Sequence, residues 1–333
     1  MKRIKQIIKN RMGPFPAGLN LISEVSWKHK MRILNYNFRH TKDYSPKPLT
    51  AKIEINSSCN LKCVMCFRET VPNRNRYMSM QEFRIVLDHL PGLILWSPHG
   101  YNEPLLHPRL YDFIAEGNQR GIKCHLVTNG VLLKPNVVDQ LLNLNVKKIT
   151  VSIDAVGKEY ERIRFPASFN MILEQLIHLK TVANGREISL AVTIWKNNLD
   201  QIPALVQLAE ELNFPILFWD IGYTHNFGES IKKNSVRFDP IPFLDEYKNN
   251  PLVKFSLHPK SNRSCTLPWS SVYVDVVGDV YPCTDNLHFR IGNLFLNSVE
   301  EIFNSQKARR FRKQSYTGQN ENCHECISWR AGK

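Results

Sequence analysis

A short apolar segment that runs into three cysteines constrains the fold of this chain most. Residues 53–58 (Ile-Glu-Ile-Asn-Ser-Ser) lead directly to Cys59, Cys63 and Cys66, which are spaced CxxxCxxC. Three thiolates in one loop after a strand form a soft, sulfur-rich metal site. Structural zinc takes four ligands in a closed tetrahedron, and the loop holds no fourth Cys or His. A cubane iron–sulfur cluster, held by three thiolates with one iron open to a small molecule, suits these residues.

The composition is that of an ordinary globular protein and indicates a cellular compartment. The 333 residues are 43% hydrophobic and 22% charged, which is enough to bury a barrel-sized core. No apolar run is long enough to cross a bilayer. Residues 1–9 have a basic start but lack the apolar stretch of a secretory signal. We therefore expect a cytoplasmic protein, in which eight cysteines indicate metal or redox chemistry rather than disulfides.

The net charge of +14 at pH 7 favours acidic partners. The basic residues are scattered, however, and the densest short run is 307–313. Residues 4–8 predict a short N-terminal helix, which we expect to pack on the fold or fray rather than to anchor a membrane. Because the chain lacks an aromatic–basic RNA-binding signature and a recognition helix, nucleic acid is not the expected partner. A zinc-stabilised nucleic-acid-binding protein is kept as a remote alternative.

Strands and helices alternate from residue 51, which predicts an α/β fold with a parallel sheet. After the first strand, the apolar segments at 93–96, 122–127, 149–153, 188–194 and 215–221 predict five more strands. Ser79 and Glu82 form a capping box at the start of a helix. Gly121 is expected to end the next helix with a positive φ. Six repeats are too few for a closed eight-stranded barrel and predict a partial (β/α)6 TIM-like barrel, with its chemistry at the carboxyl ends of the strands.

The predicted barrel occupies one part of a longer domain order. Residues 1–50 form a basic N-terminal extension, and residues 51–221 form the barrel. Residues 222–262 lose the alternation and contain several prolines, so we interpret them as a linker. Residues 263–333 predict a small C-terminal domain with a β-hairpin around Gly278, a helix near 299–311 and four cysteines, namely Cys265, Cys283, Cys323 and Cys326.

The cysteine loop resembles the cluster motif of the radical S-adenosylmethionine (radical SAM) superfamily. The resemblance implies that Cys59, Cys63 and Cys66 each bind one iron of a 4Fe-4S cluster, and that S-adenosyl-L-methionine chelates the fourth iron. The segment Gly100-Tyr-Asn-Glu103-Pro is similar to the Gly-Gly-Glu-Pro motif of that family. There Glu103 would accept hydrogen bonds from the methionyl ammonium, while Asn102 replaces the second glycine. Met65 lies at a position that contacts adenine in relatives.

The resemblance extends along the following strand ends. It implies that Asn129, in Thr-Asn-Gly at the end of the third strand, lines the cofactor pocket. Ser152 would contact the ribose, and Asp154 follows on the same side of the fourth strand. Arg164 would pair with the methionyl carboxylate. Val192 would flank the adenine from the fifth strand. Each residue alone has a structural alternative, but their order along consecutive strand ends favours the family.

The four C-terminal cysteines resemble the SPASM/twitch-type auxiliary domains of the same superfamily. The flanking segments 265–269, 278–283 and 291–294 carry this resemblance. It implies an auxiliary 4Fe-4S cluster with four Cys ligands, which would move electrons and would not bind substrate directly. By spacing alone, a structural zinc site is the alternative. The eighth cysteine, Cys124, is expected to be a small buried hydrophobe, although a thiol hydrogen donor to a substrate radical is a second interpretation.

The resemblance implies that the cofactor forms a 5′-deoxyadenosyl radical that abstracts a substrate hydrogen. We expect an oxidoreductase (dehydrogenase) that acts on a small alcohol-bearing molecule such as a sugar or aminocyclitol, with the auxiliary cluster taking the electron. An external one-electron reductant of the flavodoxin or ferredoxin type would serve it. The alternative is a peptide-modifying enzyme that forms a cross-link or inverts a residue. Asp220, Tyr223 and His225, after the sixth strand, are candidate catalytic residues.

Overall fold

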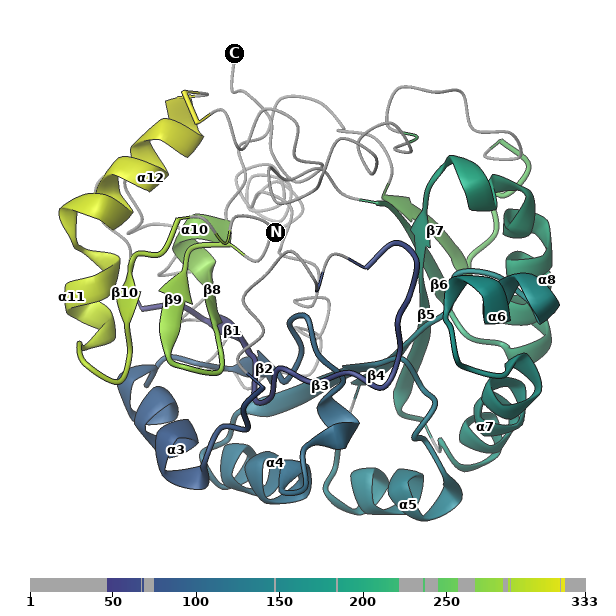
Figure 1. The fold of residues 1–333 in the computed structure, drawn as a ribbon, viewed down its shortest axis with the longest axis horizontal. Coiled ribbons are helices and arrows are strands. Elements are labelled where there is room, and N and C mark those ends of the chain that lie inside the picture. The colour runs from purple at the N-terminus through teal and green to yellow at the C-terminus, as the bar shows by residue number, and fades with distance from the viewer. Residues whose placement is uncertain are drawn as a thin grey trace, which may run out of the picture.

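A single curved sheet carries the part of the chain that the computed structural model describes (Figure 1). The described residues are 47–66, 68, 75–146, 148–183, 185–221, 236, 245–256, 267–283, 287, 289–317 and 319–320. The strand order in the sheet is β10-β9-β8-β1-β2-β3-β4-β5-β6-β7. The expected N-terminal helix, together with Tyr223, His225, Cys265, Cys323 and Cys326, lies outside the described residues.

The central strands form the partial barrel that the sequence predicts. These are β1 (Thr50–Ile53), β2 (Leu95–Ser97), β3 (Lys123–Thr128), β4 (Lys148–Ser152), β5 (Glu187–Ile194) and β6 (Ile216–Asp220). They pair in parallel and in chain order. The helices along the outer side of the sheet in Figure 1 are α3 (Met80–His89), α4 (Leu110–Gln119), α5 (Pro135–Asn143), α6 (Gly157–Ile163), α7 (Phe169–Val182) and α8 (Ile202–Leu212). The expected α/β barrel fold is thus confirmed.

Local sequence signals fix where several helices begin and end. Ser79 and Glu82 form the reciprocal capping box at the start of α3, which satisfies two backbone N–H groups. Pro135 opens α5, where its missing N–H costs no hydrogen bond. Gly121 follows α4 with a φ of 72°, a backbone conformation that residues with a Cβ rarely adopt. The predictions of a capping box at Ser79 and of a positive φ at Gly121 are thus confirmed.

Side-chain alternation divides the strands into a face toward the helices and an inner face. On β5 every second residue is buried, beginning with Ile188, and these residues belong to the hydrophobic core. The residues between them, such as Ser189 and Thr193, are half-buried. We call this second side of the sheet the inner face. Cys124 is 3% exposed and lies in the core, so the buried-hydrophobe interpretation fits its environment.

The C-terminal region continues the barrel sheet. Strand β8 (Ser271–Val274) pairs in parallel with β1, and it forms the expected hairpin with β9 (Asp279–Tyr281). Strand β10 (Gly292–Asn293) follows, with α10 (Leu267–Ser270), α11 (Val299–Phe303) and α12 (Gln306–Thr317). In Figure 1 these elements lie at one end of the curved sheet. The short expected helix is two helices, α11 and α12.

The opposite end of the sheet holds a strand that the sequence did not predict. Residues 222–262 were expected to be a linker, yet β7 (Val253–Ser256) pairs in parallel with β6. Phe255 stacks on Phe218 with 4.9 Å between ring centroids. With four residues and a single apolar pair, β7 has too short a pattern to stand out from the prolines around it. Within the described residues, every helix is too short or too polar to traverse a lipid bilayer.

Candidate cluster and cofactor site

The cysteine loop after β1 lies against the end of α6. The backbone N–H of Lys62 donates to the carbonyl of Phe165 at 2.7 Å, and that of Val64 donates to the carbonyl of Ile163 at 2.9 Å. These two bonds tie the loop to a segment about 100 residues away. Cys59 and Cys63 are half-buried, and Cys66 is exposed. The loop therefore carries three free thiols, and the hydrogen bonds to residues 163 and 165 hold its backbone in place.

Asn129 lies beside the first cysteine. Its side-chain amide donates to Asn60 Oδ1 at 2.8 Å and approaches Cys59 Sγ at 3.8 Å. The following glycine makes this turn possible, because Gly130 has a φ of 79° and a Cβ there would meet Ile172 at 2.4 Å. The predicted role of Asn129 in lining the cofactor pocket stays a prediction, and its position next to Cys59 supports it.

Three hydrogen bonds fix the carboxyl group of Glu103 close to Asn129. Its side chain is 1% exposed and accepts hydrogen bonds from Thr128 Oγ1 and the Asn129 N–H, each at 2.7 Å. The N–H of Leu105 is a third donor at 3.1 Å. Burial raises the pKa of Glu103, although the three donors oppose the shift. Because these bonds fix the direction of the carboxyl group, Glu103 is preorganised for a further cationic donor such as an ammonium.

Asn102 shapes the loop that carries Glu103. Its Oδ1 accepts from the N–H of Gly100 at 2.7 Å, and its Nδ2 donates to Asn56 Oδ1 at 2.8 Å and to the carbonyl of Pro98 at 3.2 Å. Asn56, buried, in turn donates to the carbonyl of Glu103 at 3.2 Å. Both polar atoms of the Asn102 side chain are thus used in hydrogen bonds within the protein. Asn102 can therefore contact a cofactor through its backbone.

Asp154 and Arg164 form a buried ion pair beside the cysteine loop. The two side chains are 0% and 7% exposed and lie 2.6 Å apart. Burial would lower the pKa of the Arg164 guanidinium, but the negative charges of Asp154 and the Cys63 thiolate outweigh it and raise that pKa above its usual value. Arg164 was predicted to pair with the methionyl carboxylate. In the structure its partner is Asp154, while its Nε is buried without a hydrogen-bond partner.

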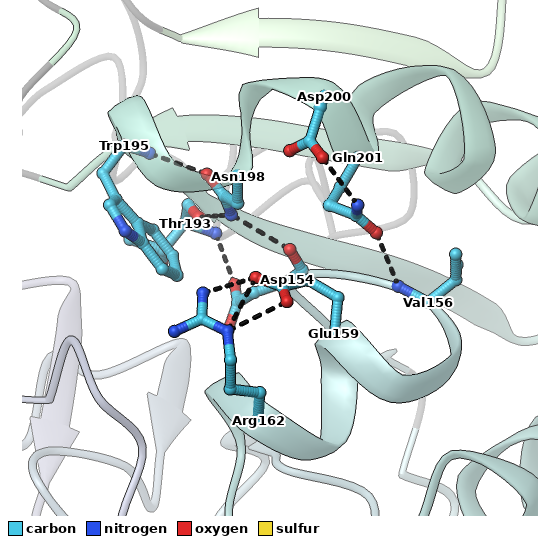
Figure 2. A network of polar contacts seen from close by, with 9 residues as sticks. All are labelled: Asp154, Val156, Glu159, Arg162, Thr193, Trp195, Asn198, Asp200 and Gln201. Atoms are coloured by element: carbon cyan, nitrogen blue, oxygen red, sulfur yellow. Dashed lines mark hydrogen bonds and ion pairs between the residues drawn. The ribbon is translucent and has the colours of Figure 1, made fainter.

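A second buried amide holds the strand ends around Asp154 together (Figure 2). Asp154 Oδ1 accepts from the N–H of Thr193 at 2.7 Å. Asn198, in the short helix η4 (Lys196–Gln201), is 1% exposed. Its Nδ2 donates to the carbonyls of Asp154 and Thr193, both at 2.9 Å, and its Oδ1 accepts from the N–H of Trp195. Sequence reasoning missed Asn198, since nothing near it distinguishes it from a helix residue.

The other predicted residues separate into those on the inner face and those away from it. Ser152 is half-buried on the inner face of β4, and Met65 is half-buried in the cysteine loop. Val192 has no exposed surface and lies in the hydrophobic core on the helix side of β5. Its predicted place beside the adenine stays a prediction, and its full burial does not support it. Asp220 is 3% exposed and accepts from the N–H of Val236 at 3.2 Å.

The chemistry of the thiols suits a cluster. Burial raises the pKa of Cys59, and raises that of Cys63 to about 11, with Arg164 opposing the shift at Cys63. A thiol in this state needs a metal to displace its proton, and iron–sulfur clusters are held by thiolates. Among the described residues no three side chains converge on one point that could hold a single metal ion. A cubane places a separate iron at each thiolate, so its ligands need not converge.

Two family models match the chain. The model of the radical SAM superfamily matches residues 53–209, and the model of an iron–sulfur cluster-binding domain, SPASM, matches residues 265–327. Of the four cysteines in the second range, the structure describes Cys283, half-buried shortly after β9.

Similar proteins include both curated sequences and solved structures. The antilisterial bacteriocin subtilosin biosynthesis protein AlbA of Bacillus subtilis is 24% identical over 305 residues, which cover 86% of this chain and 67% of AlbA. SuiB of Streptococcus suis bound to S-adenosylmethionine is 18% identical with a TM-score of 0.67, covering 98% of this chain and 81% of SuiB.

A third similar structure is that of BtrN in complex with AdoMet and 2-DOIA. It is 18% identical with a TM-score of 0.53 and covers 85% of this chain and 94% of BtrN.

The cofactors implied by the two matched domains are S-adenosylmethionine, the cluster bound by the three-cysteine motif and auxiliary iron–sulfur chemistry. Cys59, Cys63 and Cys66 would hold the cluster, which when reduced would supply the electron for cleavage of S-adenosylmethionine. The chain belongs to the radical SAM superfamily and carries a SPASM-type C-terminal region.

Proposed function

We propose that this radical SAM enzyme modifies a peptide, by forming a cross-link or inverting a residue. The observation that carries the proposal is the alignment with AlbA, which extends over 86% of this chain and so spans both the barrel and the C-terminal region. AlbA is named for the biosynthesis of a bacteriocin. SuiB has been solved with a precursor peptide, and that structure covers 90% of this chain with a TM-score of 0.64. Peptide modification is thus favoured over the small-alcohol oxidation that the sequence suggested first.

The inner face of the barrel supports a substrate rich in hydrogen-bonding groups. Polar side chains on β2 to β5 bond to one another across it: Ser97 to the carbonyl of His125, His125 to Thr150, and Thr150 to Ser189. Amide groups match such a surface, because each peptide bond offers one donor and one acceptor. In this proposal Glu103, Asn129, Ser152 and Arg164 lie on the cofactor side, and an acidic flavodoxin or ferredoxin supplies the electron.

The second candidate is the oxidation of a small alcohol. The specific observation in its favour is that the fold match covers 94% of BtrN, a structure with a small ligand bound. In this alternative, a cluster held by Cys265, Cys283, Cys323 and Cys326 accepts the substrate electron, and Asp220, Tyr223 and His225 are the substrate-side candidates. Of these three, Asp220 is buried and bonded to the backbone, which does not favour it as a base.

The test uses enzyme reconstituted without oxygen, S-adenosylmethionine, a one-electron reductant and synthetic peptides that correspond to any short reading frames flanking the gene. Cross-linking predicts a product that is lighter by two hydrogens, and inversion predicts one deuterium from solvent at unchanged connectivity. Mass spectrometry with hydrolysis and chiral analysis separates the two. A peptide returned unchanged, together with oxidation of an aminocyclitol or sugar, would overturn the proposal and establish the second candidate.

A further inference from the structure

One histidine on the inner face has its protons fixed by its neighbours. His99 follows β2 and directly precedes Gly100, the start of the loop that carries Glu103. Its Nδ1 lies 2.6 Å from Ser97 Oγ. Ser97, which is 6% exposed, also donates to the carbonyl of His125 at 2.5 Å.

The single hydroxyl hydrogen of Ser97 determines the tautomer of His99. A carbonyl can only accept, so the Ser97 hydrogen points to the carbonyl of His125. Ser97 Oγ must then accept in its contact with His99, which means that Nδ1 of His99 carries a hydrogen. In a neutral imidazole the other nitrogen has a lone pair and no hydrogen. Nε2 of a neutral His99 is therefore an acceptor.

The surroundings keep the ring neutral. Burial lowers the pKa of His99 well below its ordinary value, and the positive charge of Lys52 lowers it further. Burial likewise lowers the pKa of His125 to about 3, with Lys148 and Lys52 adding to the effect. The His99 side chain is half-buried, and its Nε2 has no hydrogen-bond partner in the described part of the chain.

We propose that His99 contacts the substrate, with Nε2 accepting a hydrogen bond from an amide N–H or a hydroxyl of the peptide at the barrel mouth. This inference rests on the proposed function for the class of substrate, but the state of the ring does not. Ser97 is a positioning residue in this arrangement, because it holds the hydrogen on Nδ1. The contact places the peptide next to the Gly100–Glu103 loop and so beside the region of the cysteine motif.

The first test examines the ring itself in the reconstituted enzyme. Diethyl pyrocarbonate acylates an unprotonated imidazole nitrogen, and at pH 5.5 a histidine of ordinary pKa near 6.5 is mostly protonated. We expect peptide mapping to find His99 labelled at pH 5.5 about as fast as at pH 7. Ser97→Thr, which keeps a hydroxyl, should preserve nitrogen-15 signals of an Nδ1–H tautomer, and Ser97→Ala should lose them. An unlabelled His99, or an Nε2–H tautomer in the unaltered chain, would overturn the proposal.

The second test uses the peptide that the assay of the proposed function identifies as substrate, together with a matched pair of variants. Glutamine places an amide oxygen near the position of Nε2, whereas asparagine reaches only as far as Nδ1. We expect His99→Asn to raise the KM for the peptide about tenfold and His99→Gln to raise it about threefold, with smaller changes in kcat. His178→Asn, on α7 outside the sheet, is the control. Equal KM values for the Asn and Gln variants would refute the substrate contact.

The outcomes of the two tests separate this inference from the proposed function. If the peptide is not modified but an alcohol is, the class of substrate changes and the KM series is repeated with that alcohol, whose hydroxyl is equally a donor. If the peptide is modified while His99 is unreactive or carries the hydrogen on Nε2, the proposed function stands and the role of His99 is refuted.

Discussion

Two buried acids, Asp154 and Glu54, have opposite electrostatic surroundings. Asp154, near the cysteine loop, lies 2.6 Å from Arg164. Glu54, directly after β1, accepts a hydrogen bond from the N–H of Tyr101 at 3.2 Å and bonds to Tyr273 of β8. The negative charge of Asp275 raises the pKa of Glu54. Burial raises the pKa of Glu54 to about 7. Asp154 is thus paired with a cation, whereas the seam between β1 and β8 contains a carboxyl group, Glu54, whose pKa is raised and which has no cation beside it among the groups that shift its pKa.

The largest expected effect is loss of the cluster. Cys63→Ala removes one of three thiolates, so iron and sulfide bound at the motif should fall by at least tenfold and cleavage of S-adenosylmethionine should become undetectable. Cys124→Ala, in the core, is the control and should keep its iron. Iron retained at the motif in Cys63→Ala would show that this thiolate is not a ligand.

The ion pair near the loop comes next. Asp154→Asn leaves Arg164 buried without its counter-charge and should lower the free energy of unfolding by about 3–5 kcal/mol. Replacing both residues, as Asp154→Asn with Arg164→Met, should cost less than the single change. Denaturant titration measures both, with the exposed Arg162→Gln as control, expected within ~0.5 kcal/mol of the unaltered chain. If Asp154→Asn is as stable as the unaltered chain, the charge of Arg164 does not depend on Asp154 for its compensation.

The seam should respond to pH in a direction set by Glu54. Its folded pKa of about 7 lies above the ordinary value of 4.5, so the folded state keeps a proton that the unfolded chain releases. Its contribution to stability is full below pH 4.5 and is lost as pH rises through 7, a change of ~3 kcal/mol. Glu54→Gln should remove this part of the pH dependence. An identical pH profile in the variant would show that Glu54 titrates normally.

Local sequence patterns predicted most of the fold and some of the residues near the cysteine loop. The strand order and the capping box at Ser79 follow from short segments of sequence. Asn129 was expected in the cofactor pocket from the family resemblance alone, and its position beside Cys59 agrees with the rule that the ends of parallel strands meet at one edge. Val192 shares the buried face of β5 with Ile188 and Leu190, so the alternation of the strand alone does not favour its predicted contact with the adenine. The pairing of β8 with β1 joins segments about 220 residues apart, and no local pattern encodes such a contact. The Asp154–Arg164 pair and the tautomer of His99 also depend on contacts that only the fold supplies.

The smallest expected effect tests whether the seam shapes the cofactor loop. Tyr273 bonds to Glu54, and a Cβ on Gly100 would meet the Tyr273 hydroxyl at 2.5 Å, so this β8 residue lies directly against the loop that leads to Glu103. Tyr273→Phe removes one buried hydrogen bond and should lower the free energy of unfolding by about 1 kcal/mol. It should also weaken binding of S-adenosylmethionine by two- to fivefold, because the loop loses the hydroxyl group that lies against Gly100. Equilibrium dialysis measures that affinity, with the more distant Tyr281→Phe, whose ring is 5.8 Å from that of Tyr273, as the matched control. If both variants bind the cofactor equally well, the C-terminal region supports the sheet without setting the loop, and the two regions are independent.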